Sequence, residues 1–388
     1  MTEPPYSARI LNALSEVSPE TWDGLANPPD RPYDPFISWG FLETMESSGS
    51  AQPETGWTPC HILLEDAQNQ AVAAMPLYAK THSQGEFVFD HAWADAFHRA
   101  GGPYYPKLLS AVPFTPVTGR RLLLGSAPPE KSAELELHLV SAAVQIAAQN
   151  NFSSLHINFV EATAAQALQE NGLLLRTDQQ FHWTNQGYKD FSDFLSTLSS
   201  SKRKNLRKER QKAQAGLIFE HLTGAQITES HWDAFFEFYM DTGSRKWGAP
   251  YLTREAFTRI GERLSEHVLL ILAYEDGTPI AGALNLIGGE ALYGRYWGCV
   301  QSRPFLHFET CYYQAIDFAI SRGLKRVEAG AQGGHKLARG YAPVTTQSVH
   351  WIAHAGLREA ISEYLDQERA AVQRETQYLQ ERTPFKKN

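Results

Sequence analysis

Three side chains that can exchange protons lie within one stretch of the sequence, residues 290–340. Glu328 ends a predicted strand, His335 follows a Gly-Gly pair, and Tyr296 lies in an aromatic-rich segment typical of a strand. Burial can raise the pKa of a carboxyl group, an imidazole changes charge near neutral pH, and a phenol can donate its proton. We therefore predict that Glu328, His335 and Tyr296 are catalytic. Each also has a plainer interpretation: an ion-paired strand carboxylate, a helix cap and a packing aromatic.

A helix predicted to begin near Phe305 could bind an anion at its amino end. It follows the strand predicted at 291–299, and its apolar residues recur at the spacing of one helical face. The first turn of a helix has backbone N–H groups without partners, which suit a phosphate. Lys336 and Arg339, one helical step apart, could add positive charge or could be a solvated pair on a loop. The residues predicted to hold the phosphates of a ligand are Arg303, Phe305, Leu306, His307, Lys336 and Arg339.

A second group of polar and aromatic side chains lies in the first half, within residues 90–124. Such density in a loop-rich region is typical of a lined cleft, so we expect a substrate to bind here. The predicted substrate-binding residues are Asp90, Trp93, Arg99, Tyr104 and Tyr105, together with Trp247 and Gln332 from two later loops. The chain has no paired Cys or HExxH signature, no GxSxG elbow and no Walker loop. We therefore predict no metal, and neither a serine hydrolase nor an NTPase.

Residues 202–212 form a strongly basic segment, with seven lysines and arginines against one acid, Glu209, for a local charge of +6. The basic residues cannot all share one stripe of a helix, so we predict a solvated cationic helix, Lys202–Lys212. It could contact the phosphates of tRNA or another nucleic acid, or an anionic surface. A plain surface helix is the alternative.

The composition is that of an ordinary globular protein, with 43% hydrophobic and 20% charged residues. The formal charge of -8 argues against wholesale wrapping of nucleic acid. Three cysteines, without CxxC spacing, indicate a reducing compartment. No apolar run is long enough for a membrane helix, and the first residues lack the apolar core of a signal peptide. We predict a cytoplasmic protein.

The predicted elements fall into two halves of similar order, which suits 388 residues. Each half has helices, a strand meander, a helix, a strand, a short helical piece and a last strand. In the first half, strands are predicted at 60–65, 71–78 and 86–89. We predict two mixed α/β domains, residues 1–186 and 187–388, each with a mostly antiparallel sheet flanked by helices.

Several segments of the sequence resemble those of a known family. In the second half these are SSSKRKNLRKER, TGSRKWGAPYL, GRYWGC, FETCYYQAIDFAISRGLKRVEAG and HKLARGYAP, and in the first half PLYAK and AFHRAGGPYYPKLLSAVPFTP. The chain resembles the FemAB-like predicted N-acyltransferases, which have two tandem domains of the GNAT acyltransferase fold. The resemblance covers the chain from about Phe36 to the last predicted helix.

The resemblance implies an N-acyltransferase that moves an acyl or aminoacyl group to an amine by direct attack. The first domain would be the acceptor side, and the second the donor and catalytic side. The donor would be acyl-CoA or aminoacyl-tRNA. Both stay open, because QSRPFL stands where acetyl-CoA-dependent relatives have a phosphate loop, and only the short basic helix stands where some Fem relatives have a coiled-coil arm. The acceptor would be a small-molecule or peptide amine. Two other classes remain: a non-catalytic module that binds peptidoglycan, sugar or peptide, and an adaptor for nucleic acid or anionic surfaces.

Overall fold

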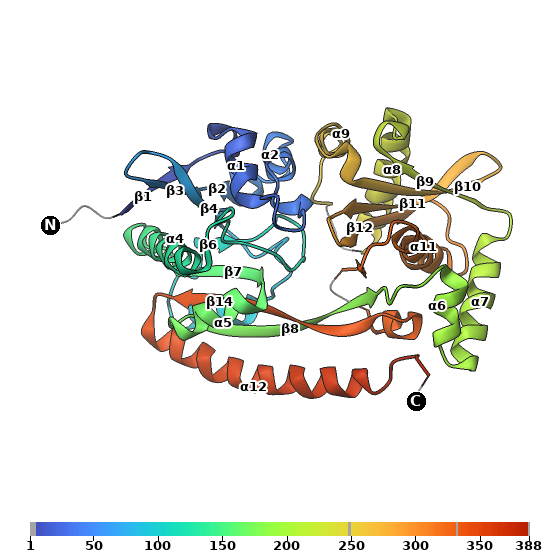
Figure 1. Ribbon diagram of the computed structural model, residues 1–388. Helices are drawn as coiled ribbons and strands as arrows, with labels where there is room; N and C mark the ends of the chain where they lie inside the picture. The colour runs from blue at the N-terminus through green and yellow to red at the C-terminus, as the bar shows by residue number, and fades with distance from the viewer. Residues whose placement is uncertain (1–4, 247–249, 331–332, 387–388) are drawn as a thin grey trace. The chain divides into compact units, whose positions relative to one another are not determined.

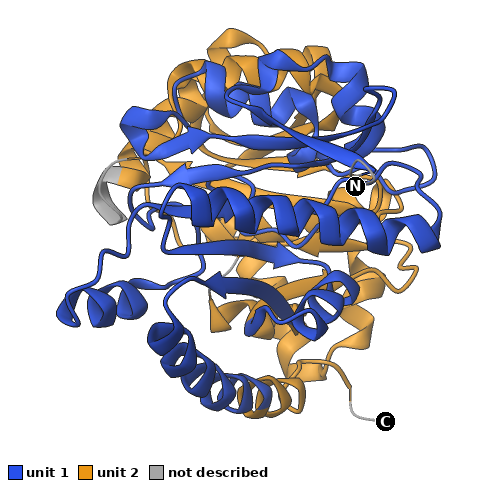
Figure 2. Ribbon diagram, turned by 90° about the vertical axis from the view of Figure 1, so that its left-hand side faces the viewer, with its two compact units in different colours: residues 1–178, 345–373 blue, residues 179–344, 374–388 orange. Residues whose placement is uncertain are grey.

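The computed structural model describes residues 5–246, 250–330 and 333–386, without the side chains of 244–246. The chain forms two compact units (Figure 2). Unit 1 comprises residues 1–178 and 345–373, and unit 2 comprises residues 179–344 and 374–388. The division therefore differs from the single boundary expected after residue 186, because residues 345–373 return to unit 1 late in the chain.

Unit 1 is built on two groups of strands. The first is a three-stranded antiparallel sheet in the order β1-β3-β4: β1 Tyr6–Leu11, β3 His61–Asp66 and β4 Ala71–Met75. The second has the order β2-β5-β6-β7-β14: β2 Trp57–Pro59, β5 Tyr78–Lys80, β6 Lys107–Ser110, β7 Ser154–Val160 and β14 Ala342–Ile352. The β6–β7 pair is parallel, and the other named pairs of this unit are antiparallel.

The helices of unit 1 bury apolar stripes against these strands (Figure 1). They are α1 Pro19–Ala26, α2 Trp39–Ser47, α3 His91–Arg99, α4 Pro129–Gln149, α5 Ala162–Glu170 and α12 Ala355–Gln380. Along α4, Leu135, Leu139, Ala143 and Ala147 recur at helical spacing and pack into one core cluster. The last of these helices, α12, gives residues to both units, because the division falls after residue 373.

Unit 2 has six strands in the order β8-β13-β12-β11-β10-β9. They are β8 Leu174–Thr184, β9 Ile218–Thr223, β10 Val268–Glu275, β11 Thr278–Ile287, β12 Ala291–Cys299 and β13 Arg326–Glu328. The predicted hairpin turn at Asp276-Gly277 is confirmed: both residues have positive φ, as a turn with the right-handed twist of its strands requires. The one parallel pair among the described strands of unit 2 joins β12 to β13.

Helices cover both faces of the unit 2 sheet. They are α6 Phe191–Thr197, α7 Ser200–Gln214, α8 Glu229–Lys246, α9 Arg254–Arg263, α10 Leu306–Phe308 and α11 Gln314–Ser321. A π-helical segment, Glu309–Tyr313, joins α10 to α11, so residues 306–321 form one continuous but irregular helix. Its apolar residues pack on Leu292 and Val327 in the largest core cluster of the unit, and α8 packs against β11 and β12.

Both units contain a parallel strand pair joined by a crossover helix. In unit 1, β6 and β7 flank α4; in unit 2, β12 and β13 flank the helix 306–321. Parallel neighbours need such a long crossover, so this shared motif accounts for the similar order of the two halves. The predicted fold class, mixed α/β with tandem GNAT-like domains, is confirmed.

Some local predictions are wrong. Residues 86–89 form no strand, because Phe87 has a φ of 59° and its segment bends. The segment 90–124, predicted as loop, contains α3 and β6. Strands β1 and β9, which were not predicted, lie at sheet edges in the topology, where one side of a strand is free of pairing.

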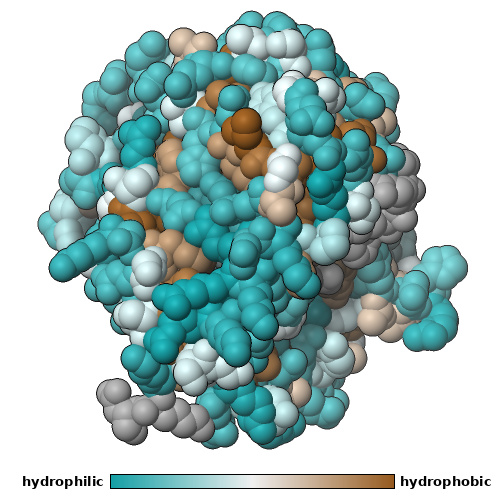
Figure 3. Space-filling view, turned by 90° about the vertical axis from the view of Figure 1, so that its right-hand side faces the viewer, coloured by the Kyte–Doolittle hydropathy of each residue, from teal (hydrophilic) through white to brown (hydrophobic). Residues whose placement is uncertain are grey.

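Hydrophilic residues dominate the face of the molecule in Figure 3, and hydrophobic ones form scattered small patches there. Among the described residues, the exposed large hydrophobic side chains come from many separate elements, as is normal for protein surfaces. Across the same residues, no helix has both the length and the apolar character needed to cross a membrane.

Candidate active site

A cavity lies in unit 2 where two parallel strands part. The pairing of β12 with β13 ends at Tyr293 and Glu328, and the residues of β12 beyond this point have no β13 partner in the register. The cavity has a volume of about 110 Å³. It is lined by strand residues Ala283, Leu284, Asn285, Gly294, Arg295, Tyr296, Trp297 and Ala329, and by helix residues His307, Cys311 and Tyr312.

A β-bulge shapes the strand side of this cavity. Asn285 pairs with Gly294, but the next residue back, Leu284, pairs with Tyr296, so Arg295 is the extra residue. Burial lowers the pKa of the Arg295 guanidinium, and Tyr296 and Glu328 oppose that shift. The bulge therefore places Arg295 and Tyr296 side by side in the cavity wall, where the Tyr296 ring packs against Tyr239 of α8, 5.3 Å away between ring centroids.

Lys336 adds a second buried cation near the cavity. Its side chain is only 2% exposed, in the 3-10 turn Gly334–Arg339, and its Nζ donates a hydrogen bond to Gly330 O at 2.8 Å. Burial lowers the pKa of Lys336 to about 8; the charge of Arg295 lowers it further, and Cys311 opposes the shift. Because Arg295 and Cys311 both line the cavity, Lys336 acts on it electrostatically.

Glu328 is buried, as the catalytic prediction requires, but it leaves the strand on the face opposite the helix 306–321. Val327 packs against that helix, and adjacent strand residues alternate between faces. Arg326 Nε donates to Glu328 Oε1 at 2.8 Å, while Oε2 has no hydrogen-bond partner among the described residues. His182 Nε2 lies 3.6 Å from that oxygen, and burial lowers the pKa of His182.

His335 and His307 lie on the helix side of the cavity. His335 Nε2 is 2.9 Å from the hydroxyl of Tyr312, and the centroid of its ring lies 6.1 Å from that of His307. Burial, with Arg339 and Lys336, lowers the pKa of His335. The structure thus brings the predicted residues Tyr296, His307, His335 and Lys336 to one region.

The start of the helix 306–321 has no capping side chain. Phe305 occupies the N-cap position with a φ of 66°, and no side chain accepts from the first turn. Arg303 is ion-paired with Glu275, and Leu306 is 1% exposed in a small core cluster. The Leu306 N–H already donates to Arg303 O at 3.3 Å, and the Arg303 guanidinium would have to exchange its carboxylate partner to bind a ligand.

Two charged side chains of the basic helix α7, Glu209 and Arg210, turn inward and bond residues close to the start of the helix 306–321. Arg210 bonds Glu309, which is fully buried, and Asp317. Glu209 accepts from Arg339 at 2.9 Å, and the Arg339 guanidinium lies 3.4 Å from the centre of the Phe308 ring. Arg210 is therefore not part of a solvated rod, and Arg339 is a buried, ion-paired residue.

The predicted substrate-binding residues of unit 1 mostly lie in a buried network. Asp90, Trp93 and Tyr104 are each at most 5% exposed, Tyr105 is half-buried, and Arg99 is exposed at the end of α3. Asp90 Oδ2 accepts from the hydroxyl of Tyr104 at 2.7 Å and from Lys107 at 2.5 Å. The structure places these three side chains in a closed interior rather than on an open wall.

Lys107 is the centre of that network. Its Nζ also bonds Ser83 at 2.8 Å and Glu86 at 2.7 Å, and its side chain is fully buried. Burial alone would lower the pKa of Lys107, but Glu86 and Asp90 raise it above its usual value. The network pairs one buried ammonium with two buried carboxylates, each of which still has one oxygen without a hydrogen-bond partner among the described residues: Glu86 Oε1 and Asp90 Oδ1.

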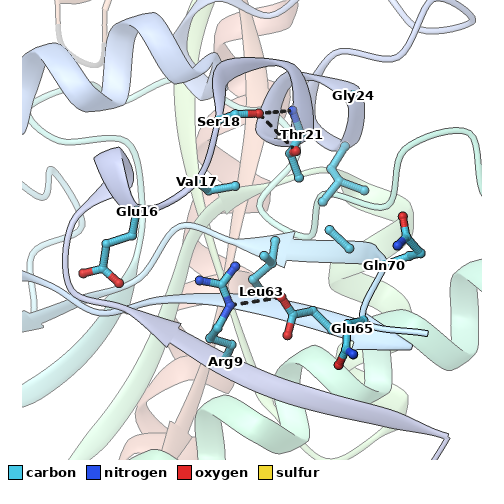
Figure 4. Close-up of a pocket in the computed structure, with 12 residues that line it drawn as sticks. Arg9, Glu16, Val17, Ser18, Thr21, Gly24, Leu63, Glu65 and Gln70 are labelled. Carbon is cyan, nitrogen blue, oxygen red and sulfur yellow. Dashed lines mark hydrogen bonds and ion pairs between the residues drawn. The ribbon is translucent and has the colours of Figure 1, made fainter. Parts of the chain in front are cut away.

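A larger cavity, about 550 Å³, lies elsewhere in unit 1, between β1, the β3–β4 hairpin and α1 (Figure 4). Arg9 pairs with Glu65 at 3.0 Å across it, and Ser18 and Thr21 bond each other at the start of α1. These groups are partnered among themselves. The smaller cavity of unit 2 is therefore the candidate active site.

Two predicted residues, Trp247 and Gln332, lie outside the described residues. Within the described part of the chain, no group of three or more His, Cys, Asp or Glu is placed to hold a metal ion. The cavity residues that were not predicted as site residues include four with polar or reactive side chains: Asn285, Arg295, Cys311 and Tyr312. A polar Asn285 between the apolar neighbours of β11 is the signal that could have indicated one of them.

Solved structures with the same fold cover nearly the whole chain. FemX is 13% identical, covers 92% of this chain and all of its own, and gives a TM-score of 0.54. The C-terminal domain of a putative lysylphosphatidylglycerol synthetase from Agrobacterium fabrum is 10% identical. The match covers 88% of this chain and 95% of that domain, with a TM-score of 0.52. L-PGS from Bacillus licheniformis is 8% identical. The match covers 87% of this chain and 99% of the L-PGS chain, with a TM-score of 0.50. A search among curated proteins finds no match.

The fold defines a class, the proteins built from tandem GNAT-like domains. The chain belongs to the FemAB-like family, described as peptidoglycan biosynthesis/recognition, whose sequence model matches residues 13–387.

Proposed function

We propose that unit 2 transfers an acyl or aminoacyl group from a phosphate-bearing donor to an amine by direct attack in the cavity between β12 and β13. The observation that carries the proposal is the cavity itself: the part of β12 that β13 no longer pairs, the start of the helix 306–321 and the cation of Arg295 meet there, and Lys336 interacts electrostatically with Arg295. Acyl transfer develops negative charge on the carbonyl oxygen, which fixed donors and cations in a buried site stabilise.

The donor's phosphates would lie at the start of the helix 306–321. The N–H groups of a first helical turn have no partner within the helix, and here no side chain caps them. His307 and Arg339 are the nearby candidates for extra contacts. The donor is acyl-CoA or aminoacyl-tRNA; the family description favours the cell-wall chemistry in which an amino acid is added to a peptide amine.

Three side chains would accept or donate the protons that move during the reaction. Glu328 has a buried oxygen without a hydrogen-bond partner and is the proposed base for the attacking amine. His335, linked to Tyr312, and Tyr296, in the cavity wall, are the proposed proton donors to the leaving group. For the acceptor, exposed Arg99 and half-buried Tyr105 of unit 1 remain the proposed contacts, because Asp90, Trp93 and Tyr104 are enclosed.

Direct attack needs no nucleophile from the protein. Burial raises the pKa of the Cys60 thiol to about 12, which removes it as a thiolate, and Cys311 is the cavity's own cysteine. The three cysteines are free thiols, which supports a cytoplasmic location.

The test is a transfer assay with purified protein, radiolabelled acyl-CoA and, separately, charged tRNA, against a panel of peptide and small amines. We expect transfer from one donor, and equal transfer by Cys311→Ala because no acyl-enzyme forms. Absence of transfer from both donors across the panel would contradict the proposal, and loss of transfer in Cys311→Ala alone would replace direct attack with a covalent route.

The exposed side of α7 supports a polyanionic partner, which we propose to be the tRNA of the donor. The helix's only acid, Glu209, and Arg210 both turn inward, so the exposed charges are all positive: Lys202, Lys204, Arg207, Lys208 and Lys212. Lys204, Lys208 and Lys212 follow each other at i, i+4 and i+8 and form a stripe about 12 Å long.

Reversal of Lys204, Arg207 and Lys208 to glutamate should weaken tRNA binding at least tenfold at 50 mM salt and flatten its salt dependence. The matched control reverses Lys131, Lys189 and Arg358, which are exposed on other parts of the chain and change the net charge equally. Filter binding measures both variants. Equal weakening by the control would mean that net charge alone acts, and selective loss of binding to anionic vesicles, with tRNA binding intact, would assign the stripe to a membrane surface.

A further inference from the structure

The helix that lines the cavity of unit 2 is interrupted by a π turn. The helix 306–321 contributes three lining residues: His307, Cys311 and Tyr312. The π-helical segment Glu309–Tyr313 overlaps them, and the backbone N–H of Gln314 donates to the carbonyl of Glu309, five residues earlier. This is the hydrogen bond of a π turn, which is rare inside a helix and needs a local cause.

The π turn decides which side chains of this helix can share the cavity. In an α-helix, side chains five residues apart point about 140° away from each other, because each residue turns the helix by about 100°. A turn closed by a bond between residues five apart brings such side chains nearly into line. The rings of His307 and Tyr312 accordingly lie 5.4 Å from each other between centroids, and both line the cavity. A regular α-helix would turn one of them away.

A fully buried carboxylate lies at the start of the π turn. Glu309 Oε1 accepts from Gln314 Nε2 at 2.7 Å, so this side-chain bond spans the same residues as the backbone bond. From α7, Arg210 Nη2 donates to the same oxygen at 2.9 Å and Gln214 Nε2 at 2.8 Å. A carboxylate only accepts, so an amide in its place would set an N–H group against one of these donors.

We propose that Glu309 and Gln314 are positioning residues: the bond between their side chains holds the π turn, and the turn keeps His307 and Tyr312 on the cavity side of the helix. Regular helical spacing would separate the first pair by the same angle as the second, so the side-chain bond and the turn require each other. The proposal rests on the proposed function in taking this cavity as the active site. It assigns the shaping of that site to two residues that do not line it.

The first test needs no substrate. NMR of histidine-labelled protein follows the ring signal of His307, which is identified by its loss in His307→Asn. The position of this signal depends on the rings of Trp297 and Tyr312, whose centroids lie 5.2 and 5.4 Å away. Gln314→Met removes the side-chain bond across the turn and should shift the signal.

The matched control breaks the same contacts from outside the turn. Gln214→Met removes one bond to Glu309, and His221→Phe removes the 2.8 Å bond between His221 Nε2 and Gln314 Oε1. This double variant keeps the bond across the turn, so the signal of the cavity histidine should stay in place. An unmoved signal in Gln314→Met, or an equal shift in the control, would overturn the proposal.

Exchange of the two groups provides a rescue. Glu309→Gln alone should shift the His307 signal, and addition of Gln314→Glu should return it, because a donor and an acceptor again face each other across the turn. These variants also decide the matter if Gln314→Met is too unstable to measure. A signal that does not return in the exchanged pair would contradict the proposal.

The second test measures transfer with the donor that proves active. Gln314→Met should lower kcat about 10- to 100-fold, as misplacement of a reacting group by about 1 Å does, and should change KM less. The control double variant should keep most of the activity. Equal losses in both, with the His307 signal unmoved, would mean a general loss of stability and would overturn the proposal. No transfer by the wild type would count against the proposed function, and the NMR result would then decide this proposal alone.

Discussion

Lys336→Met should lower turnover by about 10²–10³-fold while leaving the fold intact, because we propose that its buried ammonium group, which interacts electrostatically with the cavity residue Arg295, stabilises the charge that develops on the carbonyl oxygen. Removal of one preorganised group that stabilises developing charge typically has this effect. Methionine matches the length of the lysine stem, and it removes an ammonium that burial already disfavours. The variant should therefore melt no lower than the wild type.

The pH profile separates this role from that of a base. Burial lowers the pKa of Lys336 to about 8, so the cation is present below pH 8 and is lost above it. If the cation stabilises the transition state, activity falls as pH rises through about 8, and Lys336→Arg moves that fall to higher pH. An activity that rises through pH 8 and depends on Lys336 would make the neutral amine a base and would contradict the assignment. Exposed Lys325 offers a control, since Lys325→Met should leave the profile unchanged.

Lys107→Met should destabilise the protein by about 3–5 kcal/mol, because it leaves Glu86 and Asp90 buried without their main cation. Lys80 remains 3.9 Å from Glu86, but burial lowers its pKa to about 7, so it compensates poorly at neutral pH. Urea unfolding followed by circular dichroism measures the loss.

Neutral replacement of the partners is the control for that experiment. In the triple variant Lys107→Met, Glu86→Gln, Asp90→Asn no charge is left unpaired, so most of the lost stability should return. If the triple variant is as unstable as Lys107→Met, the loss comes from packing and not from the carboxylates. If Lys107→Met costs under about 1 kcal/mol, the network does not hold unit 1 together.

Many elements of unit 2 could be predicted from the sequence, because the patterns that indicate them extend over only a few residues. The aromatic-rich segment 291–299, the Asp276-Gly277 turn and the helical spacing after Phe305 each act over a few residues, and the structure has the corresponding strand, hairpin and helix. The sequence analysis identified Tyr296, His307 and Lys336 because they lie in the segments that flank the point where β12 and β13 separate. The roles proposed for them stay predictions.

Features that depend on residues far apart in the chain could not be predicted from the sequence. The cavity depends on where β12 leaves β13 and on a bulge at Arg295, and neither has a short-range signature. Asn285 lines that cavity, and a lone amide in an apolar strand could have marked it. In unit 1, the polar density around Asp90 suggested a cleft, but its charges are satisfied by Lys107 from a strand 17 residues away.

The most direct measurement is a crystal structure with a non-transferable analogue of whichever donor proves active, such as an amide or thioether in place of the labile bond. The acyl group should lie in the cavity between β12 and β13, beside Asn285 and Arg295, with the phosphates at the start of the helix 306–321. Density for the acyl group at any other place, with this cavity unoccupied by it, would contradict the assignment of the active site.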